Sequence, residues 1–241
     1  MQNMALQKPD PMGRAIEAYW KGNKEAAVLV YSDQMEPDEL PASYLFREPA
    51  EMPEREQFAL SQACGKVLDV GAGAGSHALA LQAAGVEVTA LEISDNACAV
   101  QKARGVQNIL HGDFFTLPAT KHDTLLLLMN GIGLAGTVEG LPHFLEVCKK
   151  WLAPGGQVLL ESSDILYLYE EEDGSVLLDL NGAYYGEMTY MMEFEGERSA
   201  PFPWLFIDFN LLEQYAQEAG LAAELLLQEE DSHYIARLTV A

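Results

Sequence analysis

The stretch VLDVGAGAGSHALAL, residues 67–81, most constrains the fold that this chain can adopt. A short apolar run ends in glycines at positions 71, 73 and 75, and an Ala/Leu-rich helical pattern follows at once. Strand, glycine loop and helix in this order form the unit with which α/β sheets hold nucleotide-like ligands. The stretch therefore predicts a parallel sheet with a ligand site where its first strand ends.

Short β-rich runs alternate with helical patterns from about residue 63 to the end of the chain. Right-handed crossovers between such elements give an α/β fold: a Rossmann-like, doubly wound, mostly parallel seven-stranded sheet with a C-terminal antiparallel hairpin. The unbroken apolar run DTLLLLMN is typical of a strand covered on both faces. Strands are predicted at 66–70, 86–92, 106–110, 123–130, 157–164, 221–228 and 233–241, and helices at 76–85, 94–105, 139–156 and 207–220.

Two segments lie outside this alternation, within what we predict to be a single domain over 1–241. Residues 1–60 contain a helical pattern at 15–22 and a Pro/Glu-rich run. Residues 165–205 form an acidic aromatic insertion with partial strand alternation at 188–199. Because ligands bind outside the carboxyl ends of parallel strands, we expect both segments to fold over that edge as a lid. The aromatic residues of the insertion include Tyr167, Tyr169, Tyr184, Tyr185, Tyr190, Phe194, Phe202 and Trp204.

The charge balance excludes several kinds of partner. The chain has 37 acidic and 14 basic residues, a formal net charge of −23. This disfavours nucleic acid, whose phosphates need Lys and Arg, and anionic membrane surfaces. Residues 161–200 hold 11 of the acids and one basic residue. These acids form either a solvated surface or a pocket for a cationic substrate.

The remaining composition indicates a cytoplasmic protein. The N-terminal residues lack the apolar core of a signal peptide, and the longest apolar run breaks at Asn130-Gly131, too early to span a bilayer. The three cysteines show neither disulfide nor metal-ligand spacing, so we expect no metal site.

Asp69, at the end of the first strand, separates the two ligand classes that use such a glycine loop. A nicotinamide fingerprint G-x-G-x-x-G needs glycine at position 76, which is Ser76, and a pyrophosphate would be repelled by the carboxylate. A ligand with an ammonium and a sulfonium group would be attracted. S-adenosylmethionine has both and no phosphate, and glycines leave room for its amino-acid end. The residues therefore favour S-adenosylmethionine over NAD.

Two further acids follow the next two strands. Glu92, 21 residues after Gly71, can accept hydrogen bonds from both ribose hydroxyls. Asp113, in HGDFF, is placed to accept from the adenine amino group, and Phe114 to supply apolar contact beside the ring. Each signal is weak alone, but acids at three successive strand ends after a glycine loop predict an S-adenosylmethionine site.

These motifs resemble the class I S-adenosylmethionine-dependent methyltransferases. The resemblance covers about residues 60–165, through VLDVGAGAGS, ALEIS, HGDFF, LLLLMNGIG and WLAPGGQVLL, and the terminal strand pair resembles that family's closing hairpin. The segments 1–60 and 165–205 lie where the family varies, so the resemblance does not define the substrate. It implies cofactor contacts from Asp69, Gly71, Ala72, Gly73, Glu92, Ile93, Asp113, Phe114 and Asn130.

Methyl transfer is an in-line displacement, for which a protein mainly supplies alignment and water exclusion. Asn130 follows the 123–130 run beside the expected methyl position; it either orients a ligand or simply serves the turn. Tyr167 and Tyr184 are further catalytic candidates. Tyr44 and Arg47 either belong to the lid, with Arg47 pairing the cofactor carboxylate, or are ordinary surface residues. His77, near the glycine loop, is predicted to be structural.

The predicted function is S-adenosylmethionine-dependent methyl transfer to a small-molecule acceptor. A regulatory protein that binds S-adenosylmethionine without turnover is the alternative, and a protein methyltransferase is another; an ordered lid over an acceptor pocket favours an enzyme. Asp69 and Ser76 disfavour an NAD-type oxidoreductase. An aminopropyltransferase would need paired carboxylates after the 123–130 run, and a base methyltransferase commonly has Asn/Asp-Pro-Pro-Tyr/Phe there; this sequence has neither.

Overall fold

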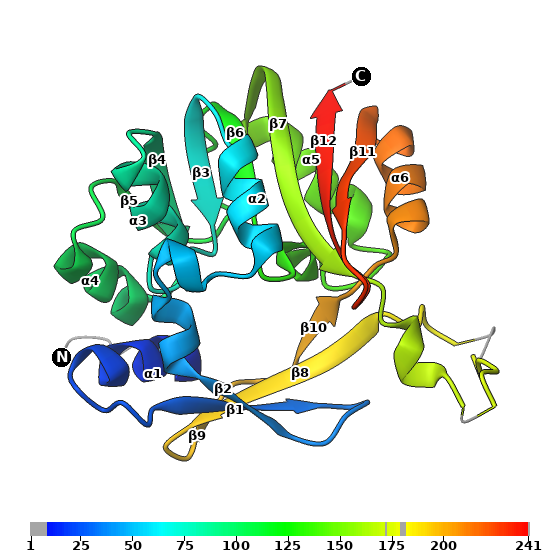
Figure 1. Ribbon diagram of the computed structural model, residues 1–241, viewed down its shortest axis with the longest axis horizontal. Helices are drawn as coiled ribbons and strands as arrows, with labels where there is room; N and C mark the ends of the chain where they lie inside the picture. Colours follow the sequence, from blue (N-terminus) through cyan, green and yellow to red (C-terminus); the bar gives the residue numbers. More distant parts are fainter. Residues whose placement is uncertain (1–8, 172, 179–181, 241) are drawn as a thin grey trace, which may run out of the picture.

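The computed structural model describes residues 9–171, 173–178 and 182–240. Within them, the large sheet has the strand order β11-β12-β7-β6-β3-β4-β5 (Figure 1). The pairs among β3 to β7 are parallel, and β12 pairs antiparallel with both β7 and β11. This confirms the predicted seven-stranded, mostly parallel sheet with its C-terminal hairpin. Residues 1–8, on which the signal-peptide expectation partly depends, and 172 and 179–181 of the insertion lie outside the described residues.

Most elements of the large sheet and its helices lie where the sequence predicts them. The strands of this sheet are β3 (Lys66–Val70), β4 (Glu87–Glu92), β5 (Ile109–His111), β6 (His122–Leu127), β7 (Leu152–Ser163), β11 (Leu221–Gln228) and β12 (His233–Val240). The α-helices are α1 (Pro11–Trp20), α2 (Glu54–Gln62), α3 (Ser76–Ala83), α4 (Asp95–Arg104), α5 (Leu141–Trp151) and α6 (Phe209–Glu218), and the 3₁₀ turns are η1 (Ala42–Phe46), η2 (Pro49–Glu51), η3 (Gly131–Ala135) and η4 (Leu166–Tyr169).

The predicted boundary between α5 and β7 is wrong. The chain leaves helical conformation at Leu152, two residues before Pro154, and β7 begins there rather than at residue 157. A residue close before proline is disfavoured in a helix, so the helix ends early. Pro154 itself lies where the pairing of β6 with β7 shifts register between His122 and Thr124. Such an irregularity accommodates a residue that has no N–H to donate.

Both faces of the parallel strands are covered, as the apolar runs predict. Neighbouring residues of one strand point to opposite sides: Leu68 joins a core cluster with residues of α5 and α6, and Val67 joins one with residues of α2 and α3. Leu125 and Leu126 of β6 divide in the same way. None of the helices in the described part of the chain is long and apolar enough to cross a membrane.

The segments 1–60 and 165–205 join in a second sheet, which the sequence analysis did not predict. Its strand order is β10-β8-β1-β2, with β9 beside β8, and β1 pairs antiparallel with β8. Figure 1 shows this sheet running across the molecule below the carboxyl ends of the parallel strands. The strands are β1 (Ala27–Ser32), β2 (Asp38–Pro41), β8 (Glu187–Phe194), β9 (Glu197–Arg198) and β10 (Phe202–Leu205).

Helix α1 fastens this small sheet to the ligand-binding half. Asp10 caps α1 by accepting from the Gly13 amide at 2.9 Å, and its other oxygen accepts from Ser94 and Asn96 at the start of α4. Ile16 of α1 is fully buried in a cluster with residues of α4. On the other side, Arg14 pairs with Glu195 and Glu197 beside β8 and β9.

Two tyrosines fasten the insertion to the large sheet. The Tyr184 hydroxyl donates to the Asp208 carboxylate at 2.8 Å and accepts from the Asp208 amide at 3.0 Å. Asp208 is itself the N-cap of α6. The Tyr185 hydroxyl donates to Asp164, just after β7, at 2.7 Å. The insertion is therefore held at the edge of the large sheet by hydrogen bonds to carboxylates.

Replacing Tyr184 by Phe removes a hydroxyl that is bonded twice to the cap of α6. We expect the free energy of unfolding to fall by about 1–3 kcal/mol, since a hydrogen bond to a charged group is lost and the carboxylate loses a donor. Urea and thermal unfolding measure the change. The control is Tyr167→Phe, because Tyr167 is 54% exposed on η4 and should leave stability unchanged. Equal stability of the two variants would contradict a structural role for the Tyr184 hydroxyl.

Candidate functional site

The glycine loop between β3 and α3 uses its own N–H groups to hold its shape. The amides of Gly71 and Ala72 donate to the Leu91 carbonyl, and that of Gly73 donates to Glu92. Gly71 and Gly73 have φ of +73° and +52°, and a Cβ on either would meet nothing within 4 Å. The loop thus offers open space but few free donors for a pyrophosphate, which agrees with the choice of S-adenosylmethionine over NAD.

Asp69 lies beneath this loop, at the end of β3, and is only 2% exposed. Its Oδ2 atom is buried and has no hydrogen-bond partner among the described residues. Burial raises the pKa of the Asp69 carboxyl, while the nearby His77 acts in the opposite direction. A buried carboxylate oxygen without a partner is unfavourable, and a cationic ligand group would relieve it.

Glu92, at the end of β4, holds the glycine loop in place. Its carboxylate accepts from the amides of Gly73, Ile93 and Ser94 at 2.7, 2.8 and 2.9 Å, and so joins the glycine loop to the start of α4. Burial raises the pKa of Glu92, and these amide bonds oppose the rise. The residue also lines a small apolar pocket. The bonds to these three amides were not predicted from the sequence; the predicted contact with the ribose remains a prediction.

The same pocket brings together the residues expected around the nucleoside. Asp113 lines it, with Oδ1 accepting from the Phe115 amide at 2.9 Å. Phe114 also lines it, but its ring lies in the core, stacked on Trp151 at a centroid distance of 5.8 Å. Ile93 is 66% exposed at the rim. Val70, Leu91, Phe115 and Leu134 complete the apolar lining.

The turn after β6 holds Met129 and Asn130 in left-handed conformation, with φ of +54° and +57°. Such a backbone is strained for residues other than glycine and needs support from its surroundings. Glu161 accepts from the Met129 amide at 2.7 Å and pairs with Arg55 of α2 at 2.9 Å. The Asn130 side chain donates to the Leu205 carbonyl of β10 at 2.9 Å, whereas its Oδ1 is buried without a partner among the described residues. Asn130 therefore serves the turn and retains an acceptor.

The aromatic candidates of the insertion are not all brought to this turn. Trp204 of β10 does lie at this turn, because its ring covers Gly133 so closely that a Cβ there would overlap it. Tyr167 lies exposed on η4, and the hydroxyls of Tyr184 and Tyr185 are bonded to Asp208 and Asp164. Burial raises the pKa of both hydroxyls well above their ordinary value, so they stay protonated at neutral pH.

Several acids of residues 161–200 bind partners within the protein. Glu161 pairs with Arg55, Glu193 with Arg198, and Glu187 accepts from the Val138 amide. Together with the pairing of Glu195 and Glu197 to Arg14, these contacts show that much of the acidic cluster stabilises the second sheet and its attachments.

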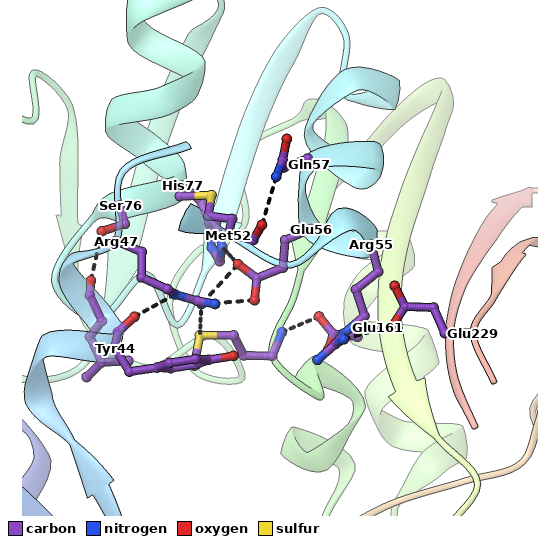
Figure 2. A network of polar contacts seen from close by, with 12 residues as sticks. Tyr44, Arg47, Met52, Arg55, Glu56, Gln57, Ser76, His77, Glu161 and Glu229 are labelled. Atoms are coloured by element: carbon purple, nitrogen blue, oxygen red, sulfur yellow. Dashed lines mark hydrogen bonds and ion pairs between the residues drawn. The ribbon is translucent and has the colours of Figure 1, made fainter. Parts of the chain in front are cut away.

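A buried network beside Asp69 includes a residue that the sequence analysis missed. Glu56 of α2 is fully buried and accepts from Arg47 at 2.9 and 3.0 Å and from His77 Nε2 at 2.8 Å (Figure 2). The Arg47 guanidinium lies over the Tyr44 ring, 3.6 Å from its centroid. Glu56 belongs to a Pro/Glu-rich run, a composition that predicts an exposed segment. The one sequence signal for its burial is that it lies three residues before Ala59, which is also buried.

The charges of this network support one another. Burial opposes ionisation of Glu56, but His77 and Arg47 outweigh it and lower the pKa of the carboxyl. Burial likewise opposes the charge on His77, but Glu56 and Asp69 outweigh it and raise the pKa of the imidazole. Glu56 therefore pairs with Arg47 and favours the protonated form of His77. Arg47, Asp69 and His77 line a pocket beside the glycine loop. Its lining residues are Tyr44, Leu45, Arg47, Asp69, Val70, Gly71, Ala72, Gly73, Ala74, Ser76, His77, Leu128 and Met129.

Known proteins share both the motif region and the whole fold. Residues 67–156 match the family model described as a methyltransferase domain. A search of the curated proteins found no significant match. The solved structure of an S-adenosylmethionine-dependent methyltransferase from Bacteroides fragilis, in complex with S-adenosyl-L-homocysteine, is 43% identical, with a TM-score of 0.90 over 97% of this chain and 95% of that one.

More distant structures share the fold. The CcbJ methyltransferase from Streptomyces caelestis is 16% identical, with a TM-score of 0.59 over 81% of this chain and 93% of that one. CalS10, an amino pentose methyltransferase from Micromonospora echinaspora, is 18% identical, with a TM-score of 0.51 over 80% and 90%. The identity and coverage of the Bacteroides fragilis structure, together with the motif match, show that this chain belongs to the S-adenosylmethionine-dependent methyltransferases.

Proposed function

We propose that this methyltransferase acts on a small-molecule acceptor bound beside the turn after β6, at the carboxyl edge that the small sheet covers. The observation that carries this proposal is the attachment of β10 to that turn: Asn130 donates to Leu205, and Trp204 covers Gly133. A sheet fixed in this way over the carboxyl edge favours an acceptor small enough to fit beneath it. A folded macromolecule would need the sheet to move away.

The residues at the carboxyl edge fit S-adenosylmethionine, the cofactor of this family. We assign Asp69 to the ammonium group, the open side of Gly71, Ala72 and Gly73 to the amino-acid end, and Glu92 to the ribose hydroxyls. The unpartnered Asp69 oxygen and the space above the loop support these assignments. In the apolar pocket, Asp113 is assigned to the adenine amino group, with Phe114 and Ile93 beside the ring.

S-adenosylmethionine supplies an electrophilic methyl group on a sulfonium, whose departure leaves a neutral thioether. The protein's part is to align the acceptor and to exclude water. The free Oδ1 of Asn130 can accept from an acceptor N–H or O–H and orient it. An amide oxygen is too weak a base to remove a proton. The hydroxyls of Tyr184 and Tyr185 already donate to Asp208 and Asp164, so we assign the role of general base to neither.

Methyl-labelled S-adenosylmethionine, incubated with the enzyme and a fractionated metabolite extract, tests the acceptor class. We expect label in a small-molecule fraction. Label found instead in a protein fraction would make the enzyme a protein methyltransferase. Tight binding of S-adenosylhomocysteine without transfer to any fraction would favour the regulatory alternative. The control is enzyme with Asn130 changed to Ala, which should take up cofactor but transfer label more slowly.

Glu92→Ala should weaken S-adenosylhomocysteine binding at least about tenfold, because hydrogen bonds from two ribose hydroxyls to a charged acceptor are lost. Three amides of the glycine loop and α4 also lose their acceptor, so we expect stability to fall as well. Calorimetric titration of the folded variant measures affinity. Glu87→Ala, at the exposed start of the same strand, is the control. Normal affinity in Glu92→Ala would overturn the ribose assignment.

Hydrogen exchange tests whether the small sheet acts as a lid. If it closes over a filled site, S-adenosylhomocysteine should increase the protection of amides in β1, β8 and β10, because closure excludes water from the methyl group. A sheet that is merely a second core should be equally protected with and without ligand. Added protection confined to the glycine loop would contradict the lid.

A further inference from the structure

Two residues of opposite charge line the same pocket, and each has a buried polar atom without a partner among the described residues. One is Asp69 Oδ2, and the other is Nη1 of Arg47, whose side chain is 10% exposed. The described protein residues give neither atom a hydrogen bond. Each is unfavourable as it stands, because a buried charged group with an unused hydrogen-bonding site loses its hydration without replacement. A ligand carrying a cation and an anion close together would satisfy both.

The other nitrogens of Arg47 are fully engaged, which leaves Nη1 as the free one. Nε donates to the Tyr44 carbonyl at 2.7 Å, and Nη2 donates to both Glu56 oxygens. The plane of the guanidinium is fixed from a third direction by the Tyr44 ring. Figure 2 shows Arg47 held between Tyr44 and Glu56 in this way. An arginine with so many contacts is pre-organised, so little side-chain entropy is lost when it binds an anion.

Glu56 owes its own position to His77. It is fully buried, and His77 Nε2 donates to Oε2 from the first turn of α3, which follows the glycine loop directly. With His77 protonated, Arg47 and His77 balance Glu56 and Asp69, and the cluster is neutral. When a zwitterion binds to a neutral cluster, the buried site still carries no net charge. A ligand that carries only one of the two charges should therefore bind with lower affinity.

We propose that Arg47 binds the carboxylate and Asp69 the ammonium of the cofactor's amino-acid end, and that Glu56 and His77 are positioning residues that hold Arg47 in place. The protein thereby selects adenosine thioethers that carry an α-amino acid over those that lack one. The proposal rests on the proposed cofactor site and adds to it a carboxylate receptor and its support.

The first test compares S-adenosylhomocysteine with 5′-methylthioadenosine, which has the same nucleoside and thioether but no amino acid. In Arg47→Ala we expect the affinity for S-adenosylhomocysteine to fall about tenfold to hundredfold, the usual size of a lost charge-assisted hydrogen bond. Affinity for 5′-methylthioadenosine should change less than about twofold. Lys66→Ala removes an exposed cation at the opposite end of β3 and serves as the control.

The outcomes separate this inference from the proposed cofactor site. If the unaltered protein binds neither compound, the cofactor site itself is misplaced. If it binds S-adenosylhomocysteine and Arg47→Ala weakens both compounds equally, the site stands but Arg47 is not the carboxylate receptor. Only selective loss of the amino-acid-bearing ligand supports the inference.

The positioning roles are tested by coupling. Glu56→Gln keeps the shape of the side chain and removes its charge, so it should lower S-adenosylhomocysteine affinity in the same selective way as Arg47→Ala. The double variant should bind no more weakly than Arg47→Ala alone, because both changes disable one receptor. Additive losses would show that Glu56 acts independently of Arg47.

Since removing one member of a buried ion pair can prevent folding, pH provides a second measurement. The charged groups that face His77 are Glu56, Asp69 and Arg47, and together with burial they leave its pKa above the ordinary value of about 6.5. As pH rises through that raised pKa, His77 loses its charge and Glu56 keeps only Arg47. The preference for S-adenosylhomocysteine over 5′-methylthioadenosine should therefore decrease.

His77→Gln supplies the matched control, because its amide can still donate to Glu56 but does not titrate. Its preference should change with pH only as far as the ligand's own ammonium group titrates. A pH profile identical to that of the unaltered protein would overturn the role of His77.

Discussion

The carboxylates of Glu56, Asp69, Glu92 and Glu161 lie buried at one edge of the large sheet, where each would be strongly destabilising without partners. The structure around them follows from that constraint. Glu92 accepts hydrogen bonds from amides of the glycine loop and of the start of α4. Glu161 binds Arg55 and the Met129 amide, and Glu56 binds Arg47 and His77. Asp69 alone keeps an oxygen with no partner among the described residues, and it faces the pocket. The contacts that stabilise the other three carboxylates thus leave the Asp69 oxygen available to a ligand.

Helix α2 connects two of these acids, because it carries Glu56 and its Arg55 pairs with Glu161. Arg55 and Glu56 are adjacent on it, yet they serve different parts of the site: Arg55 supports the turn after β6 through Glu161, and Glu56 supports Arg47 in the segment before α2. Arg55 also pairs with Glu229 near the closing hairpin. One helical turn thus fixes the Arg47 network and the turn after β6 to the same rigid element.

The sequence predicts the large sheet well because its signals are local. Glycines at positions 71 and 73, acids at the ends of β3 and β4, and apolar runs of strand length each follow from a few neighbouring residues. The small sheet could not be predicted in this way, since β1 and β8 have weak alternation and find each other only in the folded chain. Glu56 was missed for a related reason: a charged residue in a Pro/Glu-rich run is ordinarily exposed, and only its distant partners Arg47 and His77 make its burial favourable.

The turn at Met129 and Asn130 connects the Arg47 network to the small sheet. Met129 contacts Arg47 through its sulfur, 3.8 Å from Nη2, and Asn130 is bonded to β10 of the small sheet. Both residues hold a strained backbone that their neighbours maintain. A glycine here would relieve the strain, but it would lose both side-chain contacts. The strained turn thus lets consecutive side chains reach opposite directions, Met129 toward Arg47 and Asn130 toward β10. In the proposed site, these are the directions of the cofactor's amino-acid end and of the acceptor.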